Sequence, residues 1–289
     1  MGKKLIGIGL LVLGAVLLVT TVSSFLNRGG AGMEVDRVVE DLSQDAELHL
    51  ESTSVDWRIE PTSSQQLFVE IEGQKNNQKL TVSERGNRLV VKIEEGNTIS
   101  LPFLHFGPDT EAVAHVPVNM LDSFHVKTVS GDVEFAASFF GDQFSFKSVS
   151  GDIVANGLEF DQANFETTSG DIQVDNFNGG IARNKTVSGD IELEHVSGEV
   201  IADTVSGDIL VTYKDENKDV NVKTVSGDIE LEIPSLNATL DLRTTSGNMT
   251  VEEMLTDQHF EKRKASGTAG DGNFKISSNT VSGDIEIRK

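Results

Sequence analysis

The chain has 289 residues and carries 24 Lys and Arg against 46 Asp and Glu, a formal net charge of −22. Because nucleic acids and anionic lipid headgroups attract basic surfaces, this balance argues against both as electrostatic partners. The absence of cysteine excludes disulfides, thiolate metal sites and cysteine nucleophiles.

The N-terminus has the pattern of a membrane anchor. Residues 5–26 carry no charge and follow Lys3 and Lys4. As a helix this run spans about 33 Å, enough to cross a bilayer, and the lysines predict a cytoplasmic N-terminus with an exported remainder. We expect a single-pass anchor over residues 1–26 in the cell membrane, with the lipid bilayer as partner of residues 5–26 and an extracellular C-terminal domain. A signal peptide cleaved near Val22-Ser23-Ser24 is the alternative.

Residues 27–34 are rich in glycine and predict a flexible tether. Between residues 35 and 118, short runs with β-strand patterning are separated by turn signals; the runs are 46–51, 55–59, 67–71, 80–82 and 89–93. We interpret residues 35–118 as an irregular β cap region, because a solenoid needs a covered end to prevent growth from strand edge to strand edge.

A repeated phrase dominates residues 119–289. Thr224-Val225-Ser226-Gly227-Asp228-Ile229 recurs with small changes, and the central glycines of the copies are Gly131, Gly151, Gly170, Gly189, Gly207, Gly227, Gly247 and Gly283. A period of roughly 20 residues is typical of a solenoid, and coils this short hold no crossover helix. Alternating apolar residues on both sides of each phrase predict two strands per coil. We therefore expect an all-β chain: a transmembrane helix, a β cap and a parallel β-solenoid. An antiparallel array of hairpins is the alternative.

Stacking in sequence order places one carboxylate column along the solenoid, with Asn248 next and Asp284 near the end; the column is Asp132, Asp152, Asp171, Asp190, Asp208 and Asp228. Like charges about 5 Å apart repel by about 1 kcal/mol in water, so the column must be relieved. Hydrogen bonds to turn N–H groups, the partly basic column from Lys127 to Arg243, or bound cations such as calcium could do so. The column is thus a candidate cation ladder, although its spacing differs from that of nonapeptide calcium repeats.

Catalytic motifs are not evident in the sequence. The histidines show no metal-ligand spacing, and the Ser-Gly pairs lack the strand-turn-helix setting of a nucleophile elbow; the histidines are His49, His105, His115, His125, His195 and His259. We expect no catalytic residues and no cofactor, with calcium as the one candidate ion.

The repeated phrase, together with Ser52-Thr53-Ser54-Val55-Asp56-Trp57-Arg58-Ile59-Glu60-Pro61, resembles the DUF4097 adhesin-like β-repeat family over roughly residues 34–289. The resemblance implies a surface-exposed β-solenoid without established enzyme activity, and it supplies no catalytic residues. The Lys-Lys start and single apolar run are similar to those of a membrane-anchored type encoded with a cell-envelope stress system.

We therefore expect a non-enzymatic, membrane-anchored extracellular surface protein, an adhesin-like scaffold linked to the envelope stress response. Its partner would be a cell-wall component or an envelope protein. One alternative is a β-helix enzyme acting on polysaccharides, which requires a local, unrepeated cluster of acids. Another is a structural rod stabilised by calcium.

Overall fold

The computed structural model describes residues 37–72, 78–95 and 110–289. The expected anchor (1–26) and tether (27–34) lie outside these residues. Within the described part of the chain, no helix is long and apolar enough to cross a membrane.

Among the residues that the structure describes, strands account for nearly all of the regular structure. One 3-10 turn, η1 (Val118–Met120), precedes the repeats in that part of the chain. In chain order the strands are β1 (Arg37–Asp41), β2 (Ala46–Glu51), β3 (Asp56–Thr62), β4 (Gln66–Glu72), β5 (Gln78–Arg85), β6 (Arg88–Glu95), β7 (Glu111–Pro117), β8 (Leu121–Lys127), β9 (Val133–Phe135), β10 (Phe139–Lys147), β11 (Ile153–Glu166), β12 (Ile172–Lys185), β13 (Ile191–Val196), β14 (Glu199–Asp203), β15 (Ile209–Tyr213), β16 (Val220–Lys223), β17 (Ile229–Glu232), β18 (Ala238–Arg243), β19 (Met249–Val251), β20 (Thr256–Glu261), β21 (Lys264–Ala269), β22 (Phe274–Asn279) and β23 (Ile285–Arg288).

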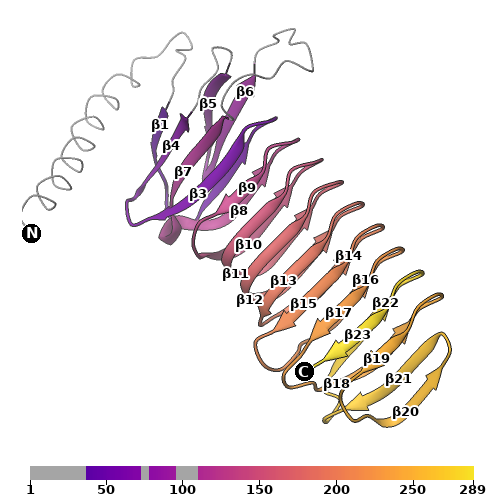
Figure 1. The fold of residues 1–289 in the computed structure, drawn as a ribbon. Helices are drawn as coiled ribbons and strands as arrows, with labels where there is room; N and C mark the ends of the chain where they lie inside the picture. Colours follow the sequence, from indigo (N-terminus) through magenta and orange to yellow (C-terminus); the bar gives the residue numbers. More distant parts are fainter. Residues whose placement is uncertain (1–36, 73–77, 96–109) are drawn as a thin grey trace, which may run out of the picture.

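Each coil contributes one strand to each of two ladders, and the coils follow one another like stairs (Figure 1). The first ladder runs β5–β6–β2–β8–β10–β11–β12–β14–β16–β22–β18–β21–β20. The second runs β1–β4–β7–β3–β9–β11–β12–β13–β15–β17–β23–β19. The long strands β11 and β12 belong to both ladders. The prediction of an all-β chain with parallel coils is confirmed.

Antiparallel strands close three of the four ladder ends. At the N-terminal end, β5 pairs with β6, and β4 with β1 covers β7. At the other end, the β20–β21 hairpin covers β18. The parallel ladder extends into the N-terminal region, since β2 and β3 pair in parallel with β8 and β9. Antiparallel cover reverses the strand direction at a ladder edge, so a coil of another molecule does not meet there the parallel partner that it has inside the rod.

The last coil is out of sequence order. Strand β22 lies between β16 and β18, and β23 lies between β17 and β19. The expectation that coils stack in sequence order is therefore wrong at the C-terminus. The chain leaves one level empty after β17, forms β18 and β19, turns back through the hairpin, and fills the gap with its final strands.

The core lies between the two ladders and is built from the inward positions of every strand. Period-2 alternation, as in β15 with its buried Ile209, Val211 and Tyr213, sends one side chain inward and the next outward. Near the first coils the core is aromatic: Phe124, Phe135 and Phe144 meet edge to face at 5.3–6.1 Å between ring centroids. Burying each such ring stabilises the fold by about 1.5–3 kcal/mol.

Candidate functional site

The repeated phrase forms a row of turns along one side of the solenoid, where each strand of the first ladder passes to the second. We call this row the turn edge. Its members are residues 52–56, 128–132, 148–152, 167–171, 186–190, 204–208, 224–228, 280–284 and 244–248, in their order along the rod. Because equivalent residues stack about 4.8 Å apart, each position of the phrase becomes a column.

The aspartates of the turn edge form a hydrogen-bonded ladder. In each step, the backbone N–H of one aspartate donates to Oδ1 of the aspartate in the preceding coil, at 2.7–2.9 Å. The ladder begins at Asp56 and ends where the N–H of Asn248 donates to Asp284. Each carboxylate therefore satisfies a backbone donor of the next coil. This is the first of the three forms of relief considered for the column, and calcium binding stays a prediction.

The glycine column explains why the phrase needs glycine. A Cβ on Gly170 would lie 2.1 Å from the carbonyl oxygen of Gly151, and one on Gly189 would lie 2.0 Å from that of Gly170. Real side chains do not approach backbone this closely, so the coils could not stack at strand spacing with any larger residue.

The first position of the phrase is buried and the second is exposed. Thr186, Thr204 and Thr224 point inward, and each hydroxyl donates to the glycine carbonyl of the preceding coil at 3.1–3.2 Å. The next residue points to solvent. It is 42–50% exposed where it is valine, at Val129, Val149, Val187, Val205, Val225 and Val281. The serines that follow are also exposed. The turn edge therefore presents parallel columns of valine methyls, serine hydroxyls and carboxylates.

Among the ladder carboxyls, Asp152 has a pKa that burial shifts. Burial raises the pKa of Asp152 above its ordinary value, although the backbone N–H of Asp171 acts in the opposite direction. Asp152 is a half-buried rung, with Asp132 and Asp171 on either side as further like charges. A carboxylate held in this way is stabilised by hydrogen bonding and opposed by its neighbours.

The column just before the phrase is mainly basic. In register it reads Lys127, Lys147, Glu166, Lys185, Asp203, Lys223, Asn279 and Arg243. Lys147 Nζ lies 3.3 Å from Glu166 Oε2. The two acids that interrupt the basic pattern thus separate basic side chains that would otherwise repel each other across adjacent strands. With five basic residues against two acids, the column keeps a net positive charge beside the aspartate ladder.

Asp56 is the ladder residue that sequence reasoning missed. Ser52, Ser54 and Asp56 occupy the same offsets as Thr128, Ser130 and Asp132, but Val55 stands where the other turns have glycine. A Cβ on Gly131 would lie 2.2 Å from the carbonyl oxygen of Val55, just as a Cβ on each later glycine would meet the carbonyl oxygen of the preceding coil. The Ser-x-Ser-x-Asp spacing could have identified this turn as a further copy of the phrase. It was not recognised because the copies of the phrase are identified by their glycine, which this turn lacks.

The histidines are not all isolated strand residues. His115 lies 3.4 Å from Glu60 through Nδ1, and His195 Nδ1 lies 2.6 Å from Asp175 Oδ1. His49 and His125, in contrast, stack on each other. Residue spacing does not reveal this pair, because β2 and β8 become neighbours only through the stacking of coils.

Comparisons with known proteins agree with this geometry. The family model described as Toastrack DUF4097 matches residues 46–288. A crystal structure of a "putative adhesin" from Bacteroides fragilis is similar at a TM-score of 0.52 and 15% identity, covering 89% of this chain and 100% of that one. A "putative lipid binding protein" from Parabacteroides distasonis has a TM-score of 0.47 and 16% identity, covering 88% and 96%. No curated protein sequence matches the chain.

Proposed function

Because the chain belongs to the Toastrack DUF4097 family, we propose that it is a non-enzymatic surface protein whose turn edge binds an extended component of the cell wall. The observation that carries this proposal is the repetition of one exposed arrangement, a valine or threonine beside a serine and a carboxylate, in successive coils. A repeated surface suits a repeated ligand, since each coil adds the same small contact and the contacts add along the polymer.

The chemistry of the edge indicates what such a ligand offers. Its carboxylates and serine hydroxyls accept hydrogen bonds from amino and hydroxyl groups, and its valine methyls pack against apolar faces of a sugar or side chain. With a net charge of −22, the chain favours a ligand that is neutral or carries amino groups. Identical acids in every coil are a structural device, whereas catalysis needs a local set of different groups, so we propose no enzyme activity.

We further propose that the protein is anchored in the cell membrane by residues 5–26, with residues 37–289 outside the cell. The support is the uncharged run behind Lys3 and Lys4. A link to the envelope stress response is the function that fits this location, as the resemblance implies. Protease added to intact cells should digest the protein, and deletion of residues 1–26 should release it from the membrane fraction. Protection of the intact-cell protein from protease would refute the proposed orientation.

Co-sedimentation of the detergent-solubilised full chain with purified cell-wall sacculi tests the binding proposal. We expect wild-type protein to pellet with the sacculi, and the double variant V187D/V205D to lose at least tenfold in apparent affinity. F140D is the control, because Phe140 is also exposed but lies in β10, eight residues along the chain from the nearest turn-edge position. Equal binding by all three proteins, or no binding by wild type, would refute the role of the edge. Because we propose no enzyme activity, the wall polymer of the sacculi should not be cleaved during the incubation.

A further inference from the structure

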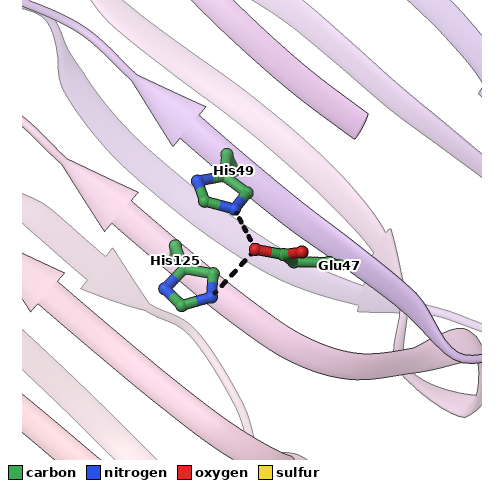
Figure 2. A group of neighbouring side chains, drawn as sticks. All are labelled: Glu47, His49 and His125. Carbon is green, nitrogen blue, oxygen red and sulfur yellow. Dashed lines mark hydrogen bonds and ion pairs between the residues drawn. The ribbon is translucent and has the colours of Figure 1, made fainter. Parts of the chain in front are cut away.

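A compact group of metal-type ligands lies on the outer face of the first ladder, away from the turn edge. Figure 2 shows its three members, Glu47 and His49 from β2 and His125 from β8. Glu47 and His49 are two positions apart and therefore share one face of the strand. His125 lies directly across from His49 in the parallel register. The fold therefore places three ligand-bearing side chains together from two distant parts of the sequence.

The donor atoms of this group converge. His49 Nε2 lies 2.7 Å and His125 Nε2 3.7 Å from Glu47 Oε1, and one donor atom from each residue lies within 4.8 Å of the others. The imidazole rings stack with centroids 4.3 Å apart and planes inclined by 23°. Tetrahedral zinc, with bonds of about 2.0–2.2 Å, holds its donors roughly 3.3–3.5 Å apart. A metal bound by imidazole lies in the plane of the ring, so one of the two stacked rings must rotate out of the stack for both Nε2 atoms to face one ion.

Stability alone gives only a partial account of this arrangement. Arg88 Nη2 already balances the charge of Glu47, at 2.8 Å from Oε1, and His49 adds a second contact to the same oxygen. At 3.7 Å the nitrogen of His125 is beyond hydrogen-bonding distance from that carboxylate. The three side chains are only 21–28% exposed, so the second imidazole is held against the first by the packing of the strands.

We propose that Glu47, His49 and His125 form a binding site for one zinc ion, with the fourth position open to water or to a group from a partner. Two imidazoles and one carboxylate are the donor set of zinc sites with three protein ligands, whereas calcium and magnesium favour oxygen ligands throughout. Arg88 is 52% exposed and can turn towards solvent when the ion takes Glu47 Oε1, or it can keep Oε1 while the ion takes Oε2.

A second group of possible ligands provides a comparison, because we expect it to bind zinc more weakly. It consists of Asp175, Glu194 and His195. It has one imidazole, and His195 is 54% exposed. Zinc prefers nitrogen to oxygen donors, and partial burial protects the bond from competing water, so the site with two histidines should bind more tightly. The two groups can be separated by substitution because they lie on different coils.

The test is zinc binding by the detergent-solubilised full chain, freed of metal by chelation. Isothermal titration and metal analysis after dialysis against ZnCl2 should give one tightly bound equivalent. H49A and H125A should each lose more than the ~10–100-fold in affinity that removal of a mere outer partner costs. E47Q, which keeps the size of the side chain, should also weaken binding, whereas H115A and H195A should keep the tight equivalent. With Co2+ in place of zinc, wild type should show the strong visible bands of tetrahedral coordination.

Circular dichroism of each variant shows whether it has folded, and E47Q and the Co2+ spectrum keep the test decisive if a histidine variant has not. No tight equivalent in wild type would overturn the proposal. So would tight zinc that survives in E47Q, H49A and H125A, or zinc that is lost only in H195A. None of these results bears on the proposed binding to sacculi, because that binding uses a different surface, the turn edge.

Discussion

Substitution of one ladder aspartate separates the role of its hydrogen bond from the role of its charge. Asp171 is an interior rung: its N–H donates to Asp152 Oδ1 and its own Oδ1 accepts the N–H of Asp190, both at 2.8 Å. D171N keeps an acceptor oxygen at this position and removes the charge. D171A removes both and leaves the N–H of Asp190 to solvent.

The magnitudes follow from the spacing of the coils. A hydrogen bond to a carboxylate contributes about 1.5–3 kcal/mol and a neutral one about 0.5–1.5 kcal/mol, so neutralisation costs roughly 1 kcal/mol. Repulsion from each neighbouring carboxylate about 5 Å away is about 1 kcal/mol in water, and neutralisation removes it. Asp171 has two such neighbours, Asp152 and Asp190, so the relief of roughly 2 kcal/mol exceeds the loss of roughly 1 kcal/mol, and D171N should be about 1 kcal/mol more stable than wild type. D171A should be about 1 kcal/mol less stable than D171N, because it also loses the neutral bond.

Thermal and urea denaturation followed by circular dichroism measures this difference. For a domain of this size, 1 kcal/mol corresponds to about 2–4 °C in Tm. Any gain of D171N over wild type should shrink as salt is raised, since screening removes the repulsion that the substitution relieves. If D171N were as unstable as D171A, the fold would need the charge itself, and the account of the ladder as turn hydrogen bonding would be wrong.

Other substitutions test other parts of the fold. G170A should destabilise the protein by more than the ~1–3 kcal/mol typical of overpacking, because the new Cβ would lie 2.1 Å from the Gly151 carbonyl oxygen. The Cβ of G86A would meet no atom within 4 Å, so that variant should lose only the stability that a positive φ costs a residue other than glycine. Urea midpoints compare the two variants. Burial, and after it the charges of Glu84 and Asp41, raise the pKa of Glu40, so the protein loses stability as pH rises through that pKa and Glu40 becomes charged. E40Q should therefore raise Tm at pH 7 and have no effect near pH 3. Equal Tm values at pH 7 would refute this. Deletion of residues 274–289 should abolish cooperative unfolding of the C-terminal half, since it empties an interior level; an unchanged urea midpoint would contradict that.

The repeat predicted which residues share a column, and it did so for physical reasons. Every level after the first needs a glycine, because the carbonyl of the preceding coil lies too close for a Cβ, and a threonine or serine stands three positions before it, so both recur. The aspartate recurs because each Oδ1 binds the following coil. The two-ladder architecture and the carboxylate column could therefore be predicted from period and alternation alone.

The order of the coils could not be predicted in the same way. All copies of the phrase are interchangeable neighbours, so the sequence does not say that Asp284 follows Asp228 and precedes Asn248. The same limit hid the histidine pair, because the partner of His49 is set by which coil stacks on β2. Local patterns report strands and turns, whereas adjacency between distant coils depends on how the whole chain winds.

The displaced last coil affects how the protein is made. A nascent chain emerges from its N-terminus, and most coils of this rod can settle on the one before as soon as they appear. Strands β18 and β19 emerge before β22 and β23, the strands that separate them from β16 and β17. The levels beyond β16 and β17 are therefore completed only after β22 and β23 have been made, and only if these strands can still enter the gap. An early stop codon would remove an interior level, and a bulky fusion at Lys289 would leave from the side of the rod, one level before its tip.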